Sequence, residues 1–252
     1  MKKLSVIVIT RNEEKNIRDC LESVRWADEI IVVDARSSDA TAELCKEFTE
    51  RIFVRDWPGF AAQKQFALDQ AKFDWVLSID ADERATPALQ RDIRTVLSDE
   101  NEAPDGYYIP RLSYFLGKKI MHSGWYPGYQ LRLFRRDRTK VSASRVHEGF
   151  LVDGRVGYLQ NDLLHFTHPS VEESLNRMNR YSSLEALDRF ERKKTKQVRW
   201  YDFIIHPFSA FARQFFVHQG FRDGIQGFIL ALISGTVKMA LYMKLWELQR
   251  KR

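Results

Sequence analysis

Two aspartates separated by one residue, Asp80 and Asp82, are the residues in this sequence best suited to hold a divalent cation. They follow the apolar segment 75–79 (WVLSI) and precede Glu83. Carboxylate oxygens are the ligands that Mg²⁺ and Mn²⁺ prefer, and both cations remain partly hydrated and bridge to phosphates. Aspartate also favours solvated turns and the first turn of a helix, so the spacing alone leaves a structural interpretation open.

A second polar group follows another apolar segment, 29–33 (EIIVV), where Asp34 precedes Ser37, Ser38 and Asp39. A carboxylate at the end of a strand can accept hydrogen bonds from ribose hydroxyls or from the N–H of a base. Ser38 or Asp39 can instead cap the next helix. The chain contains neither GxGxxG nor GxxxxGK[ST], so the dinucleotide fingerprint and the P-loop are excluded.

The elements that must position these residues alternate between strands and helices. Continuous β-branched runs predict buried strands at 4–10, 29–34, 51–55 and 75–80, and helical patterns lie between them. This alternation predicts an α/β fold with a mostly parallel, Rossmann-like sheet flanked by helices. Because ligands bind at the carboxyl ends of such strands, we expect residues 10–13, Asp34, Asp80 and Asp82 to share one edge.

After residue 105 the alternation of buried strands and helices gives way to short aromatic and β-branched segments. We therefore expect three regions in the chain. Residues 1–105 form the first half, and residues 106–190 extend the sheet with mixed or antiparallel strands before a helix. Residues 191–252 form a basic, amphipathic helical tail. Its longest uninterrupted apolar or small stretch, 227–237, is shorter than the roughly 20 residues that cross a bilayer. We therefore expect the tail to lie in a lipid headgroup region; packing on the first two regions, or forming a homodimer, is the alternative.

Charge is distributed unevenly along the 252 residues, whose formal net charge is +6. Residues 1–105 carry 15 Lys and Arg against 22 Asp and Glu, whereas residues 106–252 carry 25 against 12. An acidic half followed by a basic half indicates two different partners, unless the charge only keeps the surface soluble. Two cysteines without metal-ligand spacing, Cys20 and Cys45, indicate a reduced cytoplasmic protein, and the run 4–9 is too short for a signal peptide.

Taken together, four motifs resemble family 2 of the inverting nucleotide-sugar glycosyltransferases, which have the type-A glycosyltransferase fold. They are SVIVITRNEEKNI, IIVVDARSSDAT, GFAAQKQFALDQA and WVLSIDADE, in this order. Further segments, GWYPGYQLRLFRRD, RVHEGF, LLHFTH and GFRDGIQGF, are similar to the enzymes that add glucose to the lipopolysaccharide inner core in β-1,4 linkage. The last segment lies in the tail.

The resemblance implies roles for residues of the first half. Those expected to bind the nucleotide sugar are Thr10, Arg11, Asn12, Glu13, Asp34, Gln63, Lys64 and Asp80. Asp82 is implied to be the direct ligand of a Mg²⁺ or Mn²⁺ cofactor, with Asp80 nearer the ribose or sugar. Arg36, where family members have smaller or polar residues, either leans toward the phosphates or points into solvent.

Inversion is a single displacement, so a base must take the proton of the acceptor hydroxyl. The resemblance places this base at Glu148, with His147 as the rival and an ion pair with an arginine as the structural alternative. His165 is expected to complete the metal site or contact the diphosphate, unless it is a core residue. Arg132 and Arg135 can bind the diphosphate, and Trp125 and Tyr126 offer flat faces to an acceptor sugar or simply pack.

The sequence thus predicts a metal-dependent hexosyltransferase that moves glucose from UDP-glucose to a heptose of the lipopolysaccharide inner core. We expect it on the cytoplasmic face of the inner membrane as a peripheral protein, with its basic half facing phosphorylated lipid rather than nucleic acid. A polyprenyl phosphate or another glycan is the alternative acceptor. Nucleotidyl transfer would need a glycine-rich basic loop after the first strand, where the chain has TRNEEKN. An inactive membrane scaffold would lack the metal motif, yet both aspartates are present.

Overall fold

The computed structural model describes residues 1–252 except 100–102, 143–148, 168–169, 192–195 and 252. The chain divides into two compact units. Residues 1–111 and 128–165 form the first, here named the sheet unit, and residues 112–127 and 166–252 form the second, the helical unit. Both units therefore contain residues from more than one segment of the chain.

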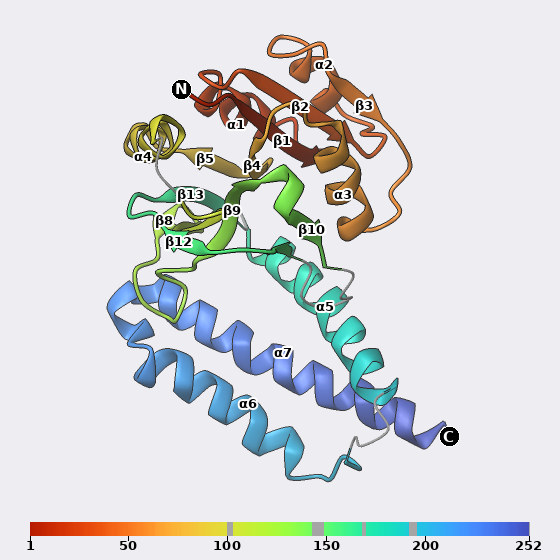
Figure 1. The fold of residues 1–252 in the computed structure, drawn as a ribbon. Coiled ribbons are helices and arrows are strands. Elements are labelled where there is room, and N and C mark those ends of the chain that lie inside the picture. The colour runs from red at the N-terminus through yellow and green to blue at the C-terminus, as the bar shows by residue number, and fades with distance from the viewer. Residues whose placement is uncertain (100–102, 143–148, 168–169, 192–195, 252) are drawn as a thin grey trace. The chain divides into compact units, whose positions relative to one another are not determined.

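A seven-stranded sheet is the centre of the sheet unit (Figure 1). Its strands, from edge to edge, are β12 (Val156–Tyr158), β6 (Gly106–Ile109), β9 (Gln130–Arg135), β4 (Trp75–Asp80), β1 (Leu4–Thr10), β2 (Glu29–Asp34) and β3 (Ile52–Val54). Strands β4, β1, β2 and β3 are parallel neighbours. β9 runs antiparallel to both β4 and β6. The expected antiparallel extension is therefore inserted beside β4 through a strand from the second half of the chain.

Helices cover both faces of this sheet because successive residues of a buried strand point to opposite sides. On one face Val6 and Val8 join an apolar cluster with Ile17 and Leu89, from α1 (Ile17–Ser23) and α4 (Pro87–Ser98). On the other, Ile7 and Ile9 join a cluster with Leu68 of α3 (Phe60–Gln70). The predicted mostly parallel sheet flanked by helices is confirmed.

Smaller elements complete the sheet unit. α2 (Thr41–Cys45) lies between β2 and β3, and β5 (Glu83–Ala85) pairs antiparallel with β13 (Leu163–Thr167). β10 (Thr139–Val141) pairs with β11 (Phe150–Val152), after a 3₁₀ turn at Arg136–Arg138. The β5–β13 pairing sets His165 opposite Glu83, directly after the two aspartates in the sequence. A residue from far along the chain is thereby brought to the DADE motif.

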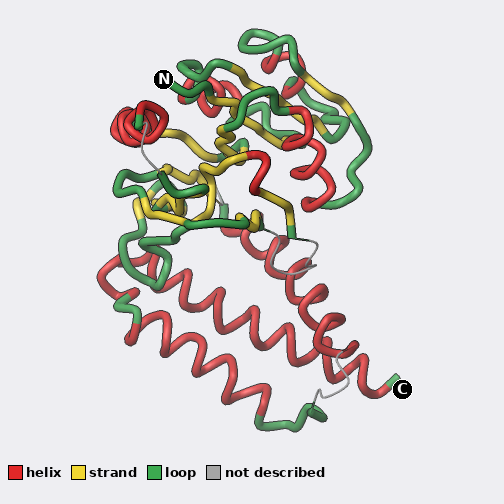
Figure 2. Tube along the Cα trace, viewed as in Figure 1, coloured by secondary structure: helices red, strands yellow, loops and turns green. Residues whose placement is uncertain are grey.

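Three long helices make up most of the helical unit (red in Figure 2). They are α5 (Val171–Glu191), α6 (Asp202–Ala212) and α7 (Gly224–Arg250), with a π-helical turn at Arg213–Val217 and a 3₁₀ turn at Gly220–Asp223 before α7. α7 packs against both α5 and α6. β7 (Arg111–Phe115) and β8 (Lys118–Lys119) form a hairpin whose Phe115 packs with Leu230 of α7.

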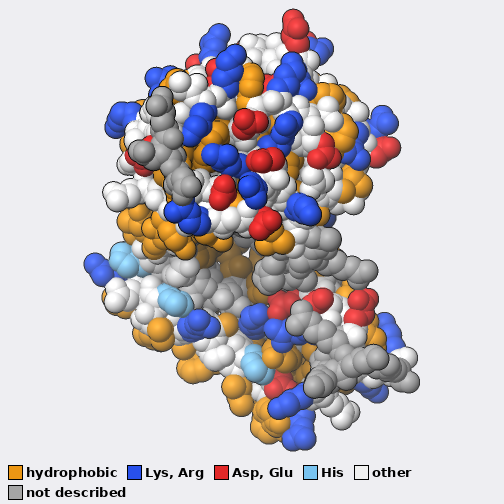
Figure 3. All heavy atoms as spheres, viewed as in Figure 1, with side chains coloured by type: hydrophobic (Ala, Val, Ile, Leu, Met, Phe, Trp, Pro, Cys, Tyr) orange, Lys and Arg blue, Asp and Glu red, His pale blue; other side chains and the backbone are white. Residues whose placement is uncertain are grey.

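The surface of the helical unit exposes many large apolar side chains among basic ones. Figure 3 shows the two kinds intermixed over the visible face of its helices. The segment Gly220–Arg250 is long and apolar enough to cross a membrane by length and composition, and 28% of its most apolar window is buried. The apolar stretch 227–237 expected from the sequence is shorter because it stops at Lys238, whereas the helix continues through that residue.

Candidate active site

The carboxyl ends of three neighbouring strands bring the first polar groups of the site together. Thr10 pairs in register with Asp34 on β2, and Ile9 pairs with Asp80 on β4. Thr10 and Asp34 are buried, whereas the Asp80 side chain is 31% exposed. The predicted grouping of these residues at one sheet edge therefore follows from the register of β1 with its two neighbours.

Two loops at this edge, 11–13 and 36–41, are fastened to each other by hydrogen bonds. The Asn12 backbone N–H donates to Ser37 Oγ (2.8 Å), and the Ser38 N–H donates to Asn12 Oδ1 (2.8 Å). The Glu13 N–H donates to Thr41 Oγ1 (2.7 Å). Asn12 adopts φ 54°, a left-handed conformation that asparagine tolerates better than most residues. Arg11 beside it is exposed to solvent.

The Asp34 carboxylate, 1% exposed, is held by the loop that follows it. It accepts the Ser37 N–H (2.9 Å) and the Ser37 hydroxyl. A carboxylate offers about four lone-pair sites, so these two bonds leave capacity for a ligand. Arg36, at φ 52°, turns instead to Asp56, with Nε 2.6 Å from Oδ1 and both side chains mostly exposed. Of the two orientations left open for Arg36, the structure has the solvent-exposed one.

A buried charge cluster surrounds Asp80. Arg132 of β9, 5% exposed, contacts the Asp80 carboxylate and lies 2.6 Å from Glu83 Oε1 through the same Nη2. Lys64 Nζ of α3 lies 3.2 Å from the other Asp80 oxygen. Burial raises the pKa of Asp80, but Arg132 and Lys64 outweigh it and hold that pKa well below its ordinary value. Asp80 therefore stays ionised.

Glu83 is fully buried beside this cluster. Burial raises its pKa above the ordinary value and the Asp80 charge adds to this, against Arg132, His165 and Arg111. The Glu83 carboxylate also accepts the Asp80 backbone N–H (2.9 Å), which fixes the turn that carries the aspartates. No role was expected for Glu83 from the sequence. Its position directly after two aspartates was the available signal, because three neighbouring acids imply a nearby cation. Only the fold shows that this cation is Arg132.

Asp82 lies next to His165, with Oδ2 3.3 Å from Nε2. The two side chains are 20% and 12% exposed. A carboxylate suits both Mg²⁺ and Mn²⁺, whereas an imidazole is an acceptable ligand for Mn²⁺ and less typical for Mg²⁺. Among the described residues no group of three or more His, Cys, Asp or Glu side chains converges on one point. A metal held by this pair would therefore need water or a bound phosphate as its remaining ligands.

Gln63 is the least satisfied polar side chain of this edge. It is fully buried in α3, yet within the described part of the chain neither its amide nitrogen nor its amide oxygen has a hydrogen-bond partner. Thr10 Oγ1 is likewise buried without a partner among the described residues. Buried polar groups are nearly always paired, and an unpaired one costs about 1–3 kcal/mol. Both groups fit a site whose partners arrive with a ligand.

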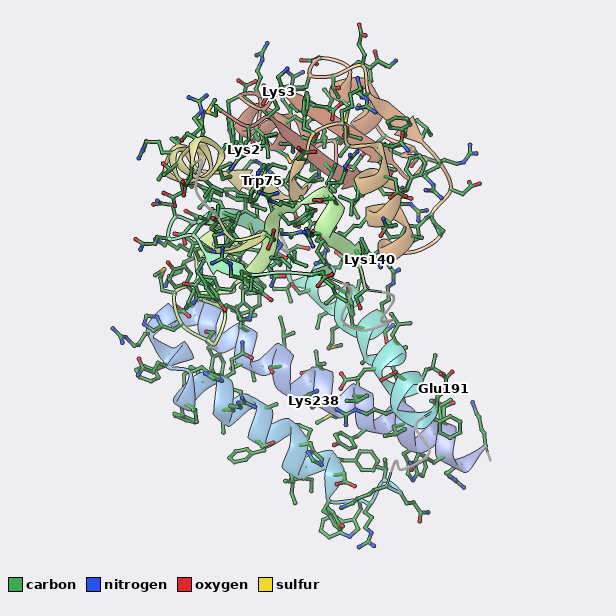
Figure 4. All side chains as sticks on the ribbon, in the orientation of Figure 1. Lys2, Lys3, Trp75, Lys140, Glu191 and Lys238 are labelled. Carbon is green, nitrogen blue, oxygen red and sulfur yellow. The ribbon has the colours of Figure 1, made fainter. Side chains whose placement is uncertain are left out.

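Other predicted site residues lie elsewhere. Arg135 pairs with Trp75, the first residue of β4 (labelled in Figure 4), so it lies at the opposite end of that strand from Asp80. Its guanidinium sits 5.8 Å from the Trp75 ring and 3.7 Å from Asp105. Two residues of extended strand, Leu133 and Phe134, separate Arg135 from Arg132, so the structure does not bring Arg135 to the Asp80 cluster.

Trp125 and Tyr126 belong to the helical unit. Both are half-buried, and the Trp125 ring packs edge-on against Phe115 with centroids 6.0 Å apart. Glu148 and His147, the two candidates for the base, lie outside the described residues. The structure thus brings together Thr10, Asp34, Gln63, Lys64, Asp80, Asp82, Arg132 and His165 within the sheet unit.

Comparison with known proteins places this site in a family. The family model described as "Glycosyl transferase family 2" matches residues 5–150. The chain is also 33% identical to the lipopolysaccharide core biosynthesis glycosyltransferase LpsC of Rhizobium meliloti, over 97% of this chain and 92% of LpsC. The chain belongs to glycosyl transferase family 2. The predicted family and the prediction of a glycosyltransferase enzyme are confirmed.

Two further similarities accompany this result. The uncharacterized glycosyltransferase RT0209 of Rickettsia typhi is 30% identical over 100% of this chain and 89% of that protein. Among solved structures, S. aureus TarS 1–349 in complex with UDP-GlcNAc aligns with a TM-score of 0.47 and 17% identity, covering 99% of this chain and 92% of that one. The alignments with LpsC and RT0209 both continue past residue 150, where the family match ends, and include residues 166–252 of the helical unit almost completely.

Proposed function

We propose that this glycosyltransferase moves glucose from UDP-glucose to a heptose of the lipopolysaccharide inner core, with inversion at the anomeric carbon. The observation that carries the proposal is the set of polar groups at one edge of the sheet, from Asp34 to Asp82. The unpartnered amide of Gln63 supports a ligand there. The similarity to LpsC supports the lipopolysaccharide core as the acceptor.

Asp82 and His165 would hold a divalent cation, Mg²⁺ or Mn²⁺. When bound, it would stabilise negative charge on the departing diphosphate. Asp80 is placed differently, because Lys64 and Arg132 already neutralise its carboxylate. We infer that Asp80 binds ribose or sugar hydroxyls through its remaining lone pairs, and that Lys64 adds positive charge on the phosphate side. Asn12, Glu13 and exposed Arg11 line the nucleotide from the first loop.

Attack on the anomeric carbon requires that a base remove the proton of the acceptor hydroxyl. We propose Glu148 for this role, with His147 as the rival, since an inverting displacement needs one base and the segment RVHEGF offers two. Exchanging Glu148 for Gln keeps the shape and removes the base. A Glu148→Gln enzyme that retains full transfer would assign the role to His147 or to another group.

We infer that the helical unit lies in the headgroup region of a membrane rather than across it. Lys238, in the middle of α7 (labelled in Figure 4), has its Nζ 3.3 Å from Glu185 of α5. Glu185 also pairs with Arg189 (2.6 Å), and Lys244 donates to Asn179 of α5 (2.7 Å). Such a charged strip along α7 is expensive in hydrocarbon but suits an interface with anionic lipid. The surface that we propose is the cytoplasmic face of the inner membrane.

A panel of nucleotide sugars tests the proposed function directly. The protein is incubated with Mn²⁺ or Mg²⁺, each donor, and either lipopolysaccharide truncated at the inner-core heptoses or a polyprenyl phosphate. Products are resolved by mass, and NMR gives their anomeric configuration. We expect a gain of one hexose from UDP-glucose, with the β configuration. Transfer only to a polyprenyl phosphate would replace the acceptor, and no turnover of any UDP-sugar would contradict the proposal.

A further inference from the structure

A buried carboxylate in the helical unit, Asp223, organises a loop that the proposed chemistry leaves unexplained. Asp223 ends the 3₁₀ turn before α7, is 3% exposed, and belongs to the GFRDGIQGF segment. It accepts the backbone N–H groups of Met121 (3.1 Å) and His122 (3.1 Å) and the Ser123 hydroxyl (2.8 Å). His122 Nδ1 lies 3.1 Å from the same carboxylate. One side chain thus contacts three consecutive residues about 100 positions earlier.

The backbone around Asp223 fastens the same loop, residues 118–127. Lys118 Nζ donates to the Asp223 carbonyl (2.7 Å), and the Ser123 N–H donates to the His218 carbonyl (2.9 Å). Gly124 has φ 70°, and a Cβ there would come within 3.2 Å of the His218 ring. The loop and the turn therefore meet without room for an added side chain.

This loop carries Trp125 and Tyr126, which the sequence offers either to the acceptor sugar or to packing; contact with the acceptor sugar is the role proposed for them here. Trp125 follows the Asp223-bound residues after a single glycine, and its ring packs on Phe115. The hydrogen bonds that hold residues 121–123 therefore also set the position of the backbone just before the two aromatic residues. On the two turns before α7 and at its start, Phe216, Val217, Phe221 and Ile225 are each more than half exposed, on the surface proposed to face lipid.

We propose that Asp223 is a positioning residue that holds loop 118–127, and with it Trp125 and Tyr126, in the conformation that binds the acceptor. The proposal rests on the proposed function for the acceptor role of the two rings. A carboxylate suits the task because it only accepts hydrogen bonds, and all its neighbours here are able to donate. An amide in its place would turn an NH₂ group toward at least one donor and leave it unpaired.

The test compares Asp223→Asn with Ser123→Ala, which removes one bond to the same carboxylate, and with Asp202→Asn as matched control. Asp202 is another acid of the helical unit, paired with His206 (3.2 Å) away from the loop. Steady-state transfer from UDP-glucose to heptose-truncated lipopolysaccharide gives KM for each substrate. Labelling with 5-fluorotryptophan gives a ¹⁹F resonance for Trp125, assigned by its loss in Trp125→Phe.

We expect Asp223→Asn to raise the acceptor KM about tenfold, equal to about 1.4 kcal/mol, with donor KM unchanged. Ser123→Ala should raise it less, both variants should shift or broaden the Trp125 resonance, and Asp202→Asn should do neither. Unchanged acceptor KM and resonance in both loop variants would overturn the proposal, as would an equal rise in donor KM. If no lipopolysaccharide acceptor is used at all, the resonance still decides whether Asp223 holds the loop.

Discussion

One guanidinium, that of Arg132, serves two carboxylates in the candidate active site. Its Nη2 contacts both Asp80 and Glu83, and burial of the cluster leaves little water to replace it. Burial by itself lowers the pKa of Arg132, yet the two carboxylates raise it above the ordinary value. Arg132 therefore stays charged, and its charge offsets the repulsion between the two acids.

Replacing Arg132 tests whether its contacts with the two acids stabilise the folded protein. Arg132→Ala removes the cation that contacts both Asp80 and buried Glu83 and leaves only Lys64 beside the first and Arg111 beside the second, so we expect a loss of about 3 kcal/mol in the free energy of unfolding. Arg135→Ala on the same strand is the control, because its side chain is 36% exposed and its partner Asp105 lies 3.7 Å away. That change should cost about 1 kcal/mol or less. Urea unfolding of both variants measures the difference, and equal losses would contradict the bridging role.

Gln63 gives a second prediction at the residue scale. Gln63→Leu removes a buried amide without partners in the described chain, so the free protein should keep its stability or gain up to about 1–2 kcal/mol. Affinity for UDP should fall at the same time, by about tenfold, if the amide binds the donor. Thermal unfolding and calorimetric titration report the two effects separately. Unchanged UDP affinity would remove Gln63 from the donor site.

At the scale of elements, Glu29 joins three parts of the sheet unit. It opens β2 and is 9% exposed, and it accepts the Ser5 hydroxyl of β1 (2.6 Å) and the Lys72 backbone N–H after α3 (2.9 Å). Arg51, just before β3, pairs with it. Burial raises the pKa of Glu29, but these hydrogen bonds and Arg51 outweigh it, and the pKa is lower than its ordinary value.

A pH dependence follows from that lowered pKa. A carboxyl with a lower pKa in the folded state contributes stability above its unfolded pKa and loses it as pH falls through the folded value. Glu29→Gln should therefore cost about 1–3 kcal/mol at about pH 7 and less at about pH 3. Urea unfolding at both pH values checks this. A difference between variant and wild type that stays constant with pH would contradict it.

The sequence predicted the elements that local patterns encode. β1 and β2 are continuous β-branched runs and are buried along their whole length, as expected. The position of β9 between β4 and β6 was not predictable, because LRLFRR fits an antiparallel strand anywhere in a sheet and only long-range packing selects its neighbours. For the same reason, the sequence could not show which of Arg132 and Arg135 contacts Asp80, because the register of β9 with β4 decides it. Asp34 and Asp80 needed only the rule that parallel strands share a carboxyl edge.

At the scale of the whole molecule, the acidic and basic halves of the chain contribute to two different surfaces, the sheet edge and the surface of the helical unit. The acids of residues 1–105 include Asp34, Asp80 and Asp82 at the sheet edge. The basic second half contributes the helical unit, where exposed apolar side chains lie among Lys and Arg. A net charge of +6 is therefore consistent with the proposed anionic lipid surface.

Vesicle binding tests that surface. Phe216 and Val217 are 60% and 72% exposed before α7, and replacing both with Ala should weaken binding to anionic vesicles by about tenfold. Leu151→Ala is the matched control, because Leu151 is 62% exposed on the sheet unit. Binding should also weaken with added salt and with neutral lipid. Cosedimentation measures each case, and a Phe216/Val217 variant that binds like wild type would contradict the proposed membrane face.

The central claim is that the carboxylates at the sheet edge support metal-dependent sugar transfer. The most direct measurement compares glucose transfer from UDP-glucose to heptose-truncated lipopolysaccharide by wild type and by Asp82→Ala, over a Mn²⁺ titration. We predict that wild type requires Mn²⁺ and that Asp82→Ala loses about 10²–10³-fold in turnover. An Asp82→Ala enzyme with full, metal-dependent turnover would contradict the account.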